Sequence, residues 1–134
     1  MIGLDTNVLV RYLAQDDARQ SARATRLMEK ELTPLKPGFI SLVVLVEMCW
    51  VLQRLYAATD VELIDTVADL LGSATLQVES RAVVQATVQR LRSLKSKAGF
   101  ADHLIVEIAK NQGCTHTFSF DKAAVRSAGM QLLA

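Results

Sequence analysis

The chain has 134 residues, of which 51% are apolar and 22% charged. These values are typical of a globular protein and give enough length to bury a real core. The formal net charge of +1 does not by itself indicate a nucleic-acid-binding protein. Two prolines and six glycines leave little room for a linker. We therefore expect residues 1–134 to form a single domain.

The sequence gives several indications of the cellular compartment. The longest apolar run, residues 42–52, is too short to cross a bilayer, which takes about 20 apolar residues. The N-terminal sequence MIGLDTN has an early acid and no basic segment, which argues against a signal peptide. Cys49 and Cys114 lack a metal-ligand spacing, so we expect two reduced, small core side chains. Together these features predict a cytoplasmic protein that does not associate with membranes.

Short apolar segments alternate with helical patterns along the chain. Residues 1–4 are apolar and end at Asp5, which predicts a buried strand, a tight turn and a short helix. Ser41 is placed to cap the helix that carries Glu47, and Thr59 to Glu62 has the capping-box pattern T-x-x-E. Further helices are expected over residues 18–32, 60–71, 80–94, 100–110 and 122–127. Further strands are expected over residues 39–41, 76–79, 115–120 and 130–133.

This alternation of strands and helices decides the fold class. Strands separated by helices indicate a parallel sheet that is covered on both faces and built from right-handed crossovers. We therefore predict an α/β fold with three α/β/α layers and a central, mostly parallel sheet of about four or five strands.

Charges are unevenly distributed along the chain. Residues 55–80 contain five acids and no base, whereas residues 81–97 contain five bases and no acid. The bases of the second segment are Arg81, Arg90, Arg92, Lys95 and Lys97. Two interpretations are open, namely two solvated helix faces of opposite sign or a basic rim that holds a phosphate backbone. Four more bases share a face of the helix predicted over residues 18–32. They are Arg19, Arg23, Arg26 and Lys30.

Four acids lie where the predicted topology places a ligand site. Ligands bind beyond the carboxyl ends of strands in an open parallel sheet, and Asp5 and Asp121 each follow a predicted strand. Asp102 is expected in the first turn of its helix, where the helix dipole favours an anion. Glu47 is the one charged residue of the apolar run 42–52, and it reaches the same edge if its helix lies across it. A meeting of the four acids is therefore a hypothesis from topology.

Each acid also has a plain structural interpretation. Asp5 and Asp121 fit helix caps, and Asp102 fits a partner of the helix dipole. Burial of an unpaired charge costs several kcal/mol or neutralises the group. Glu47 is therefore expected to reach solvent at the helix edge, to pair with an arginine or to face a cation.

Four acids that meet repel one another unless they protonate or bind a cation. Ligands that are all oxygen favour Mg²⁺ or Mn²⁺ over zinc. Such a cation deprotonates a bound water and neutralises a phosphoryl oxygen, which indicates hydrolysis of a phosphodiester. Thr6, Asn7 and Ser119 are expected to orient the carboxylates, or to serve only as turn and cap residues. His103 adjoins Asp102 but points about 100° away on a helix, so we expect it at the surface.

The segments around these acids resemble a known family. LDTNVL at residues 4–9, the apolar helix with Glu47, FAD at residues 100–102 and SFD at residues 119–121 together resemble a PIN domain. The length and the stretch ISLVVLVEMCWVL are most similar to the VapC toxins of bacterial type II toxin–antitoxin modules. The resemblance extends over nearly the whole chain. His103 departs from the small apolar residues that are common after the third acid.

The resemblance implies an endoribonuclease that depends on Mg²⁺ or Mn²⁺. Asp5, Glu47, Asp102 and Asp121 match the acidic quartet of the family, with Asp5 and Asp102 as the most direct metal ligands. Ser119 stands where the family often has serine or threonine. The resemblance also implies a homodimer, and a small antitoxin protein whose C-terminal segment wraps the toxin and holds it inactive.

Two other functions compete with this one. A PIN-like module without catalytic activity binds RNA or a protein and turns nothing over. A metal-dependent phosphatase acts on small phosphate monoesters and leaves RNA intact.

Overall fold

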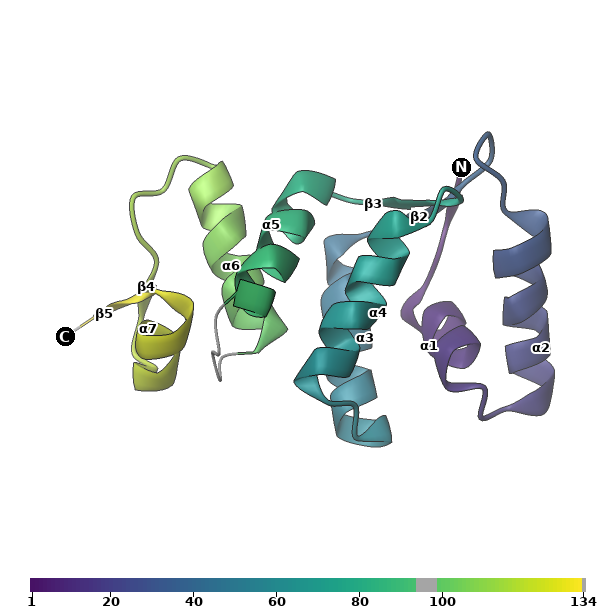
Figure 1. Cartoon of the computed structure of the whole chain (residues 1–134), viewed down its shortest axis with the longest axis horizontal. Helices are drawn as coiled ribbons and strands as arrows, with labels where there is room; N and C mark the ends of the chain where they lie inside the picture. Colours follow the sequence, from purple (N-terminus) through teal and green to yellow (C-terminus); the bar gives the residue numbers. More distant parts are fainter. Residues whose placement is uncertain (94–98, 134) are drawn as a thin grey trace. The chain divides into compact units, whose positions relative to one another are not determined.

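The computed structural model describes residues 1–93 and 99–133, and Figure 1 gives the order of the elements. The chain divides into two compact units, Met1–Arg81 and Ala82–Ala134. The first unit contains β1 (Ile2–Gly3), α1 (Thr6–Ala14), α2 (Ala18–Arg26), η1 (Leu27–Glu31), β2 (Gly38–Ile40), α3 (Leu42–Tyr56), α4 (Asp60–Gly72) and β3 (Leu76–Val78). The second contains nearly all of α5 (Arg81–Ser93), then α6 (Phe100–Asn111), β4 (Phe118–Ser119), α7 (Lys122–Ala128) and β5 (Gln131–Leu132).

Every strand pair among the described residues is parallel, which confirms the predicted α/β fold. In the first unit the strand order is β1-β2-β3, and in the second unit β4 pairs with β5. Ile2 pairs with Gly38, Gly38 pairs with Leu76, and Phe118 pairs with Gln131. The strands are therefore hydrogen-bonded as one group of three and one group of two.

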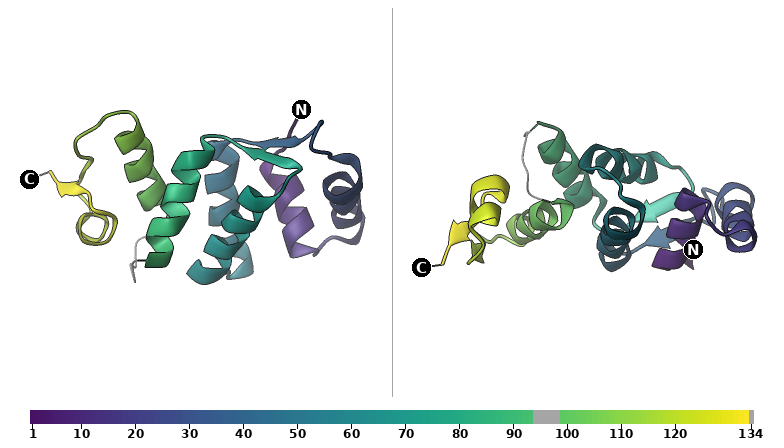
Figure 2. Two further views of the ribbon diagram at one scale, coloured as in Figure 1. Left: turned by 45° about the horizontal axis from the view of Figure 1, so that its top comes forward. Right: turned by 90° about the horizontal axis from the view of Figure 1, so that it is seen from below.

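Helices α1 and α3 leave neighbouring strands of the first sheet. Figures 1 and 2 show α1 beside both α2 and α3, and the contacts between these helices agree. The core of this unit includes fully buried side chains from the sheet and from α1, α3 and α4. They include Leu9, Ile40, Leu45, Met48 and Val67. Because β1 and β2 are parallel, the exits of these strands, which precede α1 and α3, lie at one edge of the sheet.

The helix starts follow the predicted caps. The Ser41 hydroxyl accepts a hydrogen bond of 3.2 Å from the Val44 amide at the start of α3. At the start of α4, Thr59 accepts from the Glu62 amide, while the Glu62 carboxylate accepts from the Thr59 amide. This capping box lowers the pKa of the Glu62 carboxyl, mainly through the hydrogen bond from the Thr59 backbone. Both predicted caps are confirmed.

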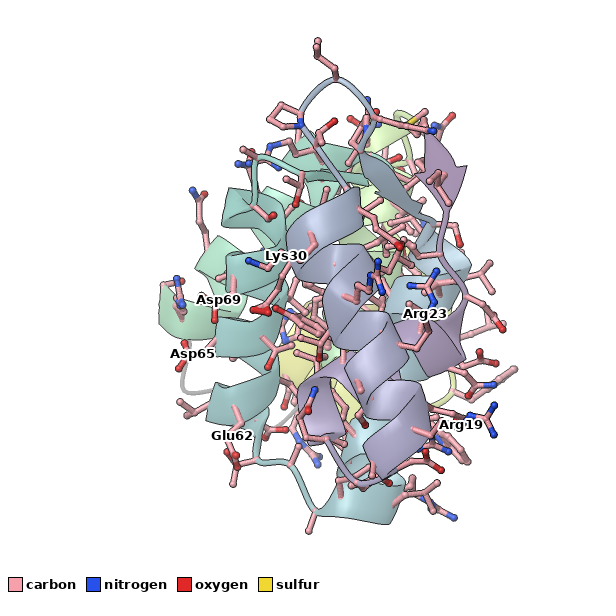
Figure 3. All side chains as sticks on the ribbon, turned by 90° about the vertical axis from the view of Figure 1, so that its right-hand side faces the viewer. Arg19, Arg23, Lys30, Glu62, Asp65 and Asp69 are labelled. Carbon is pink, nitrogen blue, oxygen red and sulfur yellow. The ribbon has the colours of Figure 1, made fainter. Side chains whose placement is uncertain are left out.

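The helix predicted over residues 18–32 is continuous but changes its winding. It begins at Asp17, whose carboxylate accepts from the Gln20 amide, and its last turn is a π-helix over Leu27–Glu31. Its four bases are exposed, as predicted for a shared face. Glu31 binds two of them, Arg23 at 3.1 Å and Arg26 at 3.9 Å. Figure 3 shows Arg19, Arg23 and Lys30 on this helix and Glu62, Asp65 and Asp69 on α4.

The second unit has a small core of its own. Val106 of α6 packs with Ala124 and Ala128 of α7 and with Met130. Gly129 has a φ of 77° and ends α7 in the left-handed conformation that favours glycine. Lys95 and Lys97 of the expected basic segment lie outside the described residues. Within the ranges 1–93 and 99–133, no helix is long and apolar enough to cross a membrane.

Two predictions about individual side chains are wrong, and a third is right. Cys49 is buried as predicted, and burial raises its thiol pKa to about 12. Cys114 is exposed, because it follows the left-handed turn at Gly113 that ends α6. His103 is fully buried, and this burial lowers the pKa of its imidazole. The buried face of α6 therefore includes His103, which was predicted at the surface, and leaves Ile105 half exposed.

Gly38 is a position where the sheet needs the absence of a side chain. A Cβ at Gly38 would lie 2.7 Å from Leu4 Cδ1 and 2.9 Å from Leu32 Cδ1. Gly38→Ala is expected to lower the free energy of unfolding by about 1–3 kcal/mol, because buried leucines must move. Gly3→Ala is the matched control, since nothing lies within 4 Å of its Cβ position. Urea denaturation measures both, and equal losses would contradict this explanation.

The side chain of Tyr56 links the end of α3 to the loop after α1 by a hydrogen bond. Its hydroxyl donates to Asp16 and lowers the pKa of that carboxyl, while the same bond raises the pKa of Tyr56. The stability from this bond is present between the ordinary pKa values of 3.8 and 10.0, and is lost below and above them. Tyr56→Phe is therefore expected to lower Tm slightly at neutral pH and to weaken its fall in acid and alkali. The control is Tyr12→Phe, because the hydroxyl of Tyr12 donates a longer hydrogen bond, of 3.4 Å, to Glu29.

Candidate active site

Asp5 lies just after the end of the first strand, β1. The Leu4 amide donates to the Phe39 carbonyl at 2.9 Å, which holds the chain in the sheet up to this point. Asp5 takes the N-cap position of α1, but its carboxylate makes no capping hydrogen bond to the helix. The side chain is exposed. The plain interpretation of Asp5 as a helix cap therefore leaves its carboxylate unexplained.

A side-chain hydrogen bond joins this exit to the middle of α3. The Thr6 hydroxyl donates to Oε1 of Glu47, which lies 41 residues further along the chain. Thr6 is 4% exposed, whereas Glu47 lies on the exposed side of α3. Of the three expected environments for Glu47, the structure therefore has the carboxylate at a solvent-accessible edge of the helix. The carboxylate is held in place there by a buried hydroxyl group.

Asn7 lies on α1 next to Thr6 and lines a groove. The groove has a volume of about 440 Å³ and lies between α1 and α2. Its polar lining includes Asn7, Arg11, Gln20 and Arg23. Arg11, which also lines the groove, was not predicted from the sequence as a residue beside the candidate site. Its position one helical turn after Asn7, on the same face, is the signal that would have found it.

The other two acids lie in the second unit, at the starts of two helices. Asp102 is half-buried in the first turn of α6, as predicted. Asp121 is the N-cap of α7, and its Oδ1 accepts from the Ala123 amide at 2.8 Å. The Ser119 hydroxyl accepts from the Asp121 amide at 3.0 Å. Ser119 therefore shapes the turn that presents Asp121, and the capping interpretation of Asp121 holds for one of its oxygens.

The structure thus defines two parts of the candidate site, one in each unit. Thr6 and Glu47 are in contact beside Asp5, and Ser119 and Asp121 are in contact. Across residues 1–93 and 99–133, no three His, Cys, Asp or Glu side chains form a group that could hold a metal ion. The meeting of all four acids stays a prediction.

A comparison with protein-family models gives a match that covers both units. A sequence model of the PIN domain matches residues 2–129, nearly the whole chain and both units. The chain therefore belongs to the PIN domain family. No curated protein sequence matches it. PIN domains are in general metal-dependent nucleases, so membership supports a hydrolase that acts on nucleic acid.

The hydrogen bond from Thr6 to Glu47 can be tested directly. Thr6→Val keeps the shape of this buried side chain and removes its hydroxyl group. We expect nuclease activity to fall about 10- to 100-fold, the usual effect of losing a partner that orients a metal-binding carboxylate. Thr6→Ser keeps the hydroxyl and is expected to keep most of the activity.

The matched control for Thr6→Val is Thr87→Val. Thr87 is fully buried too, but its hydroxyl donates to the Val83 carbonyl of its own helix at 2.9 Å. The Thr87→Val variant is expected to change the stability of the protein and to leave its nuclease activity intact. If both variants lost activity equally, the loss would come from the fold and the role of Thr6 would be refuted.

Proposed function

We propose that this PIN domain protein is an endoribonuclease that depends on Mg²⁺ or Mn²⁺, the toxin of a VapBC-type toxin–antitoxin module. Its site is formed by Asp5, Glu47, Asp102 and Asp121, with Thr6, Asn7 and Ser119 as supporting polar residues. The single observation that carries the proposal is the hydrogen bond from Thr6 to Glu47. This hydrogen bond orders the exposed carboxylate of Glu47, in the middle of α3, beside the strand exit that carries Asp5.

The donor chemistry of these residues fits a hard divalent cation. All four candidate ligands are carboxylates, and oxygen ligands are those that Mg²⁺ and Mn²⁺ prefer. Thr6 occupies one oxygen of Glu47, and the Ala123 amide occupies one oxygen of Asp121. Each of these carboxylates keeps a second oxygen for a ligand. Asp5 makes no capping bond and is exposed, so its carboxylate is suited to the most direct contact.

The residues of the chain prepare the site before any reaction. When bound, the metal ion supplies an activated water and neutralises charge on the phosphoryl group. The Thr6 hydroxyl fixes the rotamer of Glu47, which lowers the cost of arranging the carboxylate around the reacting groups. The Ser119 hydroxyl holds the Asp121 backbone, so the start of α7 presents that carboxylate in a defined direction.

We also propose for this protein the partners and the compartment of a toxin–antitoxin module. The substrate is RNA, a small cognate antitoxin protein holds the enzyme inactive, and the active form is a homodimer in the cytoplasm. The resemblance to VapC toxins supports these points. A short neighbouring gene that encodes a small DNA-binding protein is the expected genetic context.

The metal and Asp5 give the main test. We expect RNA cleavage by the full chain with Mg²⁺ or Mn²⁺, and none after EDTA removes the metal. Asp5→Asn is expected to lower cleavage more than about a hundredfold, beyond the loss expected for an orienting partner. Asp69→Asn is the control, because Asp69 is an exposed acid on α4 and is expected to leave cleavage unchanged. Full activity of Asp5→Asn would refute the metal site.

The same assay separates the competing functions. RNA binding without turnover under any divalent metal would identify a catalytically inactive binding module. Release of phosphate from a small monoester, with RNA left intact, would identify a phosphatase.

A further inference from the structure

The exposed face of α3 contains an aromatic side chain beside Glu47. Val43, Glu47, Trp50 and Arg54 are separated by four, three and four residues, so they form one stripe along the helix. Val43 is 76% exposed and Trp50 is 57% exposed. The opposite face of the helix supplies the core with Leu45, Met48, Cys49 and Leu52. The tryptophan is therefore not needed to anchor α3.

Trp50 is associated with a cation. The guanidinium carbon of Arg54 lies 5.3 Å from the centroid of the Trp50 ring, a cation–π distance. Trp50 remains more than half exposed in this arrangement. Proteins that bind single-stranded nucleic acid combine aromatic rings with basic side chains, since a base stacks on the ring and the cation attracts the phosphate.

We infer that Trp50 and Arg54 form a platform that stacks one base of a single-stranded RNA substrate, one helical turn from Glu47. This inference rests on the proposed function, because it supplies the reason for RNA to approach this face. Trp50 and Arg54 are positioning residues that bind a nucleotide flanking the cleaved bond. The preference is for unpaired RNA, whose bases are free to stack, and it is tolerant of sequence because every base has a π-face.

The chain has one tryptophan, so its fluorescence reports on the platform alone. The test uses the full-length Asp5→Asn protein with Mg²⁺, which under the proposed function does not cut RNA during the titration. A short unpaired RNA of mixed sequence is expected to quench the fluorescence. An abasic ribose-phosphate strand of the same length, which keeps the phosphates and lacks the bases, is expected to leave it unchanged. Equal quenching by both strands would overturn the stacking.

Variants measure the contribution of the ring. Trp50→Leu is expected to weaken the binding of dye-labelled RNA about tenfold, a typical loss for one stacked base, and Trp50→Phe to restore most of it. Arg54→Gln is expected to weaken binding less than Trp50→Leu. In the protein with Asp5 intact, Trp50→Leu raises KM for unpaired RNA and leaves kcat unchanged, which a general structural defect would not do.

Leu55→Ala is the matched control on the same helix. Leu55 is 71% exposed but lies about 140° around the helix from Trp50, so its loss is expected to leave RNA binding unchanged. Unchanged RNA affinity of Trp50→Leu, with cleavage intact, would overturn the platform and leave the proposed function standing. Active Asp5→Asn would instead refute the proposed function.

A second copy of the chain is the competing occupant of this face. In that case Trp50 fluorescence changes with protein concentration rather than with RNA, and Trp50→Leu converts a dimer to a monomer in light scattering. That result would overturn the platform. Arg54→Gln keeps the test decisive if Trp50→Leu fails to fold.

Discussion

The hydrogen bond between the Thr6 hydroxyl and the Glu47 carboxylate links the exit of β1 to α3 in the first unit. It depends on the parallel pairing of β1 with β2, because this pairing makes α1 and α3 start at the same edge of the sheet. It also depends on Ser41, whose hydroxyl fixes where α3 begins and therefore which residues face α1. A shift of α3 by one residue would turn Glu47 about 100° away from Thr6.

The parts of the fold that sequence predicts well are those decided by local chemistry. The caps at Ser41 and Thr59 satisfy the backbone amides of the next turn, and only neighbouring residues take part. The buried face of α6 is not predictable in this way. Both His103 and Ile105 are compatible with a helix, and the packing of neighbouring elements decides which of them is buried. The exposure of Cys114 likewise depends on a turn whose direction no local pattern specifies.

Several residues of the uneven charge pattern have local structural partners. Arg23 and Arg26 bind Glu31 at the end of their own helix, and Glu62 completes a cap. These charged side chains therefore take part in interactions at helix ends. In the predicted basic segment Arg90 is half-buried, and its guanidinium reaches a point 3.0 Å from where a Cβ of Gly129 would lie. Arg90 thus contributes to packing within the second unit, which favours a structural explanation for at least this member of the proposed basic rim.

The apolar stretch around Glu47 contains two kinds of hydrophobic residue. Leu45, Met48 and Cys49 are in the core, whereas Val43 and Trp50 are exposed on the side that carries the carboxylate. A high apolar content therefore overstated the burial of Glu47, because hydropathy counts residues on both faces of a helix alike. The core face accounts for only part of the hydrophobicity. The exposed apolar residues beside the ordered carboxylate lie outside the buried core of this unit, so we attribute them to what the helix binds.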